Sequence, residues 1–68
     1  MALYYVNKNE QDNGDHEVHE WGCDWLPLEE NRIYLGEFDS CSPAVREART
    51  YYEQSNGCVR CSRACHTG

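Results

Sequence analysis

The chain has 68 residues, five of them cysteines, and a formal net charge of −6. A chain of this length predicts a single small domain, residues 1–68, that buries only about 60% of the surface its unfolded form exposes. The excess of acidic side chains argues against nucleic acid as a partner, because phosphate groups repel a negatively charged surface.

The first half of the chain is typical of a small β-sheet. Residues 3–8 and 16–21 are rich in aromatic and β-branched side chains or alternate apolar with polar ones, and the turn signal Asn13-Gly14 lies between them. We therefore expect a β-hairpin. Residues 22–31 predict an irregular connection whose Trp25, Leu26 and Leu28 fold back over the sheet. Residues 31–38 predict a third strand, and Gly36 within it indicates a bulge or a close backbone approach.

The clearest single element is a helix after this strand. Ser42 is a good N-cap, and Pro43 suits the first helical position, where its missing N–H has no cost. The apolar side chains then recur at helical spacing, and Asn56-Gly57 predicts the end of the helix. The sequence therefore predicts an α+β fold: a three-stranded antiparallel sheet, one C-terminal helix and a tail resembling a zinc knuckle.

The cysteines predict how this small domain is stabilised. A domain of this size usually needs a disulfide, a metal or a partner chain. The first twelve residues lack the basic and long apolar segments of a signal peptide, and no apolar run of about 20 residues could span a membrane. A cytoplasmic location follows as the expectation, and cytoplasmic thiols stay reduced. Five cysteines also cannot all pair, so metal binding is favoured over structural disulfides.

Two short motifs supply candidate metal ligands. Cys58 and Cys61 form a C-x2-C pair, which offers two thiolates from one tight turn. His19 and Cys23 form an H-x3-C pair at the end of the second predicted strand. Zinc takes four tetrahedral nitrogen and sulfur ligands, so these four residues predict a Zn²⁺ site.

Three further residues are alternative ligands. Cys65 and His66 follow the C-x2-C pair closely and could complete a site within the tail, in place of His19 and Cys23. Cys41 precedes the predicted helix and is a third choice. Cysteine is also often a small buried apolar residue, and that interpretation is favoured for Cys41.

The order of these motifs resembles a known family. An H-x3-C pair, the strand NRIYLGEF, an alanine-containing helix and a C-x2-C pair are similar to the zinc-binding module of Ada-type DNA-repair methyltransferases, over about residues 16–61. The resemblance implies His19, Cys23, Cys58 and Cys61 as ligands, although the Ada module itself uses four cysteines. The segments YYVN, NGDHEVH and YLGEF also resemble a group of small bacterial Cys/His-rich proteins, which implies no particular activity.

These observations favour a non-catalytic zinc module that binds another protein. One alternative is a thiol redox protein that uses Cys58 and Cys61, but redox C-x2-C motifs begin a helix, whereas this one follows the predicted helix end. A second alternative is an Ada-like module associated with nucleic acid, in which Arg60 and Arg63 would contact phosphate. A metalloenzyme would need a general base such as Glu17 or Glu20; a solvated strand face explains both acids more simply.

Overall fold

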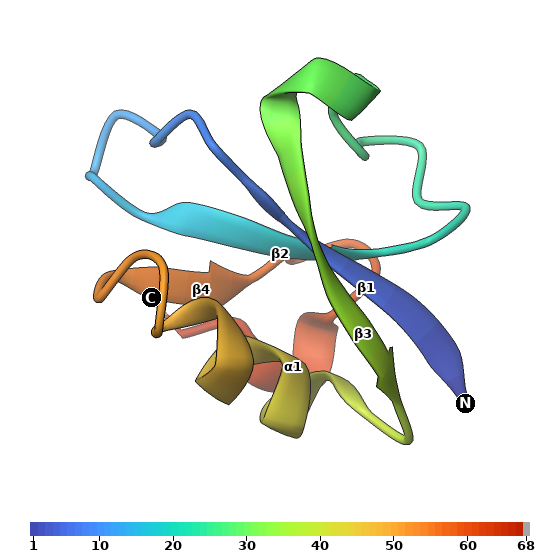
Figure 1. Cartoon of the computed structure of the whole chain (residues 1–68). Coiled ribbons are helices and arrows are strands. Elements are labelled where there is room, and N and C mark those ends of the chain that lie inside the picture. The colour runs from blue at the N-terminus through green and yellow to red at the C-terminus, as the bar shows by residue number, and fades with distance from the viewer. Residues whose placement is uncertain (68) are drawn as a thin grey trace.

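A mixed four-stranded sheet and one α-helix make up the α+β fold (Figure 1). The computed structural model describes residues 1–67. β1 (Ala2–Asn7) and β2 (His16–Glu20) form the predicted antiparallel hairpin, and β3 (Arg32–Phe38) pairs antiparallel with the other edge of β1. The strand order is β3-β1-β2-β4. Within these residues no helix is long and apolar enough to cross a membrane.

The fourth strand corrects the predicted three-stranded antiparallel sheet. β4 (Ser55–Gly57) pairs parallel with β2, and Val18 lies opposite Gly57. Backbone hydrogen bonds extend the pairing at both ends: His16 N–H donates to the Gln54 carbonyl at 2.9 Å, and Cys58 N–H donates to the Val18 carbonyl at 3.0 Å. Three polar or glycine residues carry no strand periodicity, so this pairing leaves no local pattern in the sequence.

The helix is shorter than predicted and begins earlier. α1 (Cys41–Ala48) follows Ser40 as its N-cap rather than Ser42, and it ends well before Asn56-Gly57. Beyond the helix, the Thr50 hydroxyl donates to a backbone carbonyl one turn back at 2.7 Å. Tyr52 then stacks flat on His16, with ring centroids 3.7 Å apart, so residues 49–54 lead the chain to β2 instead of extending the helix.

The core lies between α1 and the sheet, because the helix contacts all four strands. A bulge at Gly36 changes the pairing from Tyr4–Gly36 to Tyr5–Tyr34, as the glycine predicted. The expected covering of the sheet by the 22–31 connection is wrong. Trp25 is 52% exposed and Leu28 is 67% exposed, and Leu26 is half-buried but does not belong to the core cluster. The buried core cluster consists instead of Tyr4, Val6, Val18, Leu35, Cys41, Ala44, Val45 and Ala48.

Candidate metal centre

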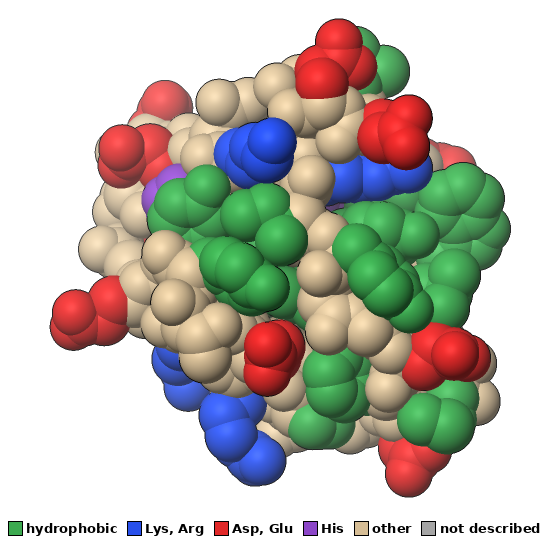
Figure 2. Space-filling model, in the orientation of Figure 1, with side chains coloured by type: hydrophobic (Ala, Val, Ile, Leu, Met, Phe, Trp, Pro, Cys, Tyr) green, Lys and Arg blue, Asp and Glu red, His purple; other side chains and the backbone are tan. Residues whose placement is uncertain are grey.

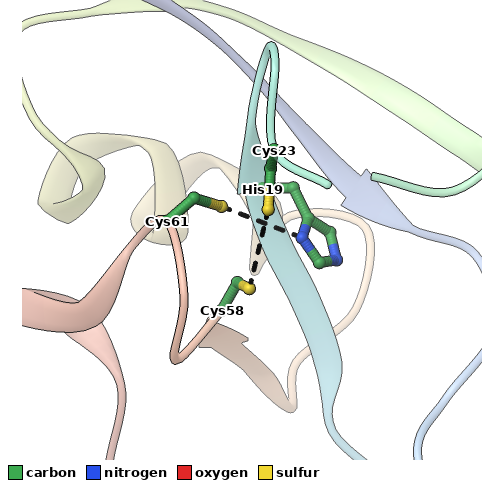
Figure 3. Close-up of side chains that lie close together, drawn as sticks. All are labelled: His19, Cys23, Cys58 and Cys61. Atoms are coloured by element: carbon green, nitrogen blue, oxygen red, sulfur yellow. Dashed lines mark hydrogen bonds between the residues drawn. The ribbon is translucent and has the colours of Figure 1, made fainter. Parts of the chain in front are cut away.

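Four potential ligands converge where the parallel strands β2 and β4 end (Figure 3). His19 belongs to the last part of β2 and Cys23 to the turn after it, while Cys58 directly follows β4 and Cys61 lies one turn later. Because the two strands run in the same direction, the loops that follow them leave the sheet at the same edge. The four ligand atoms all lie within 4.8 Å of one another, close enough to hold a metal ion.

Two of the ligand–ligand distances are close to those of tetrahedral coordination. The Sγ atoms of Cys23 and Cys58 are 4.0 Å apart, and Cys61 Sγ is 3.9 Å from His19 Nδ1. Zinc bonds of about 2.0–2.3 Å correspond to ligand–ligand separations of about 3.5–3.8 Å around a tetrahedron. These two separations therefore exceed the tetrahedral values by only a few tenths of an ångström, while the four atoms as a set lie within 4.8 Å and would draw closer around an ion. One imidazole and three thiols are a donor set that suits zinc.

Backbone amides also point at two of the sulfur atoms. Glu20 N–H donates to Cys61 Sγ at 3.3 Å, and Arg60 N–H donates to Cys58 Sγ at 3.4 Å. An N–H group beside a sulfur atom stabilises the negative thiolate, which is the form that binds metal. The first of these contacts also joins the two loops, because it runs from the end of β2 to the second cysteine of the C-x2-C pair.

Burial disfavours the charged form of two of the four side chains, His19 and Cys61. It lowers the pKa of His19 to about 4, so the imidazole is unprotonated at neutral pH and has a free electron pair for a metal. Burial, followed by the neighbouring Cys23, raises the pKa of Cys61 to about 12. The Cys61 thiol must therefore lose its proton when a metal ion binds. The positive charge of the ion then stabilises the buried thiolate.

The other two cysteines are used differently. Cys41 and Cys65 form a disulfide with a sequence separation of 24, which joins the start of α1 to the tail. Cys41 is thus buried but bonded, not a free thiol, and neither residue joins the four-residue cluster. The odd number of cysteines divides into this pair and three free thiols, Cys23, Cys58 and Cys61. A disulfide and a candidate metal site therefore occur together, whereas the sequence favoured metal binding in place of a disulfide.

His66, the remaining alternative ligand, faces a backbone group. Its Nδ1–H donates to the Gly57 carbonyl at 3.0 Å. The tail is held beside β4 by Asn56, whose side-chain oxygen accepts a hydrogen bond from Thr67 N–H at 3.0 Å and whose amide donates to the Thr67 carbonyl at 2.8 Å. This segment packs so closely that a Cβ on Gly57 would lie 2.8 Å from Cys65 Cβ.

Glu17 lies beside the cluster, although sequence analysis placed it on a solvated face. Its side chain is only 10% exposed, and one carboxylate oxygen is 3.6 Å from His19 Nε2. Burial raises the pKa of this carboxyl group. The sequence did contain a signal for this contact: Glu17 and His19 are two residues apart, and residues at this spacing on a strand lie on the same face.

Comparison of the chain with family models, curated proteins and solved structures found no match. The geometry of the site therefore carries the functional argument.

Proposed function

We propose that the chain is a small zinc-binding module in which Zn²⁺ joins the loop after β2 to the loop after β4, and which acts as a protein-interaction domain. The observation that carries the proposal is the convergence of one imidazole and three thiols from positions about 40 residues apart in the chain. Soft thiolate ligands favour zinc over magnesium or calcium, and Cys3His is a common set for structural zinc.

The ligand count supports a structural rather than a catalytic metal. A catalytic zinc site keeps a coordination position for water or substrate, whereas His19, Cys23, Cys58 and Cys61 would fill all four positions. Cys58 is fully buried, which also disfavours the thiol redox alternative, since a reactive cysteine needs access and a lowered pKa.

A cobalt titration tests the metal proposal. Co²⁺ in a tetrahedral site with thiolate ligands gives intense visible bands and near-ultraviolet charge-transfer bands. We expect these bands to saturate at one Co²⁺ per chain and to disappear when Zn²⁺ is added. Bands of octahedral Co²⁺ only, or an unchanged spectrum, would refute the site. The Cys58→Ser variant should lose the charge-transfer intensity of one thiolate, whereas the His66→Ala variant, which leaves both the cluster and the disulfide intact, should keep the full spectrum.

Exposed aromatic side chains support the interaction role. Trp21 is 58% exposed and Tyr34 is 52% exposed. Figure 2 shows hydrophobic side chains gathered over the face that β1 and β3 present, with both acidic and basic side chains around them. Aromatic residues and arginine are enriched in protein interfaces. A concavity of about 410 Å³ on this part of the surface is lined by Leu3, Tyr5, Glu29, Arg32 and Tyr34.

The charge indicates what kind of partner fits this face. Residues 1–40 hold two basic and ten acidic side chains, a net charge of −8, so a protein surface that presents basic side chains is the complementary partner. Affinity capture with the wild-type chain should retain a protein that the double variant Trp21→Ala/Tyr34→Ala does not. Identical capture by both chains, or capture of nucleic acid alone, would contradict this role.

The cytoplasmic location stays a prediction, and the Cys41–Cys65 pair offers a test of it. In a reducing compartment both residues should react with a thiol-alkylating reagent added at cell lysis, whereas an oxidising compartment should protect them as the disulfide.

A further inference from the structure

Glu17 and His19 form a buried pair beside the candidate metal centre. They lie two residues apart on β2, and their side chains are 10% and 1% exposed. His19 Nε2 lies 3.6 Å from a Glu17 carboxylate oxygen. Within residues 1–67, this Nε2 is the buried side-chain nitrogen or oxygen that has no hydrogen-bond partner. A buried polar atom without a partner destabilises the folded state, so its position calls for an explanation.

The two ring nitrogens of His19 face different neighbours. Nδ1 is directed toward the cysteines, 3.9 Å from Cys61 Sγ (Figure 3). Nε2 lies on the other side of the ring, 3.6 Å from a Glu17 carboxylate oxygen. If Nδ1 gives its electron pair to a metal, the single proton of the neutral ring must be on Nε2. That N–H group is buried and needs an acceptor. The separation of 3.6 Å is about 0.6 Å longer than an ordinary N–H···O hydrogen bond, a gap that a small rotation of the Glu17 side chain can close.

We propose that Glu17 is the positioning residue of the metal centre: its carboxylate accepts the Nε2–H of His19 and so directs the Nδ1 electron pair at the metal. The inference rests on the proposed metal site and adds to it which nitrogen coordinates. A carboxylate behind a metal-bound imidazole fixes the ring orientation and increases the basicity of the ligand. Glu17 faces the opposite nitrogen from the one that coordinates, so it supports the ligand and does not act as a general base at the metal.

Variants at Glu17 test this role through zinc affinity, measured by competition with a chromophoric chelator. Removal of such a partner typically weakens metal binding by about 10–100-fold, which we expect for Glu17→Ala. Glu17→Gln keeps a carbonyl oxygen as acceptor and should recover part of the loss. Glu37→Gln removes an exposed carboxylate from another strand and is the matched control, with unchanged affinity expected.

Nitrogen-15 NMR of the zinc-loaded chain supplies a measurement that general destabilisation would not change. We expect His19 to carry its proton on Nε2 and to coordinate through Nδ1 in the wild-type chain. In Glu17→Ala that proton should exchange faster with water. Zinc binding with wild-type affinity in Glu17→Ala, or coordination through Nε2, would overturn the role of Glu17 alone. A wild-type chain that binds no zinc would overturn the metal site as well.

Discussion

The disulfide between Cys41 and Cys65 predicts a large, measurable share of the stability of this small domain. The bond ties the first residue of α1 to the tail that follows the C-x2-C pair. Its sequence separation of 24 gives, from the loss of chain entropy in the unfolded state, a stabilisation of about 3.5 kcal/mol near room temperature. Natural domains are stable by only about 5–15 kcal/mol in total, so this contribution is substantial.

Urea unfolding followed by tryptophan fluorescence measures this contribution. With a dependence on urea of about 1 kcal/mol per molar for so short a chain, removal of the bond should lower the midpoint by about 3.5 M, or leave the chain unfolded without urea. The perturbation is the double variant Cys41→Ala/Cys65→Ala, studied at the same free zinc concentration as the wild-type chain. A zinc-compatible phosphine reductant should lower the wild-type midpoint and leave the variant unchanged. A difference of less than about 0.5 M between the two chains would refute the reasoning.

Further predictions concern the histidine ligand and two glycines. His19→Ala should lose most of its zinc affinity and His66→Ala should keep it, as measured by chelator competition, because only His19 belongs to the cluster; the reverse result would place the site within the tail. Gly57→Ala should destabilise the chain by about 1–3 kcal/mol in urea unfolding, because the added Cβ would lie 2.6 Å from a backbone oxygen, Ser62 O. At Gly22, where φ is +92° and the space is open, Asn should restore most of the stability that Ala loses, since Asn tolerates this conformation. At Gly57, Asn should be no more stable than Ala, because the obstacle is the packed tail and not the backbone conformation. A loss of less than about 0.5 kcal/mol in Gly57→Ala would contradict this close packing.

The sequence predicted those parts of the fold that depend on neighbouring residues. The hairpin followed from Asn13-Gly14 between two strand-like segments, and the bulge followed from Gly36 within a strand. β4 could not be predicted in this way, because its three residues are held by backbone pairing with β2, about 40 residues earlier. The predicted helix was too long for the same reason: residues 54–57, which were expected to end it, pair instead with β2.

Each half of the candidate site could be predicted separately. The H-x3-C and C-x2-C spacings each bring two ligands close together along the chain, but the contact between the two pairs depends on the parallel pairing of β2 and β4. The Cys41–Cys65 bond was not predictable, because the sequence alone does not determine which cysteines pair. Glu17 was assigned to a solvated face because a short strand rich in acids and histidines resembles an exposed edge, and its burial depends on the pairing of β2 with the distant β4.

Native mass spectrometry of the purified chain, before and after a chelator, tests the central claim most directly. The account predicts one zinc ion per chain, bound to a protein that is lighter by two hydrogens for the Cys41–Cys65 bond and by further protons displaced from the cluster thiols. After chelation the metal should be lost, and the charge states should shift to those of a less compact chain. A compact chain that takes up no metal in excess zinc, and whose spectrum does not respond to chelator, would contradict the account.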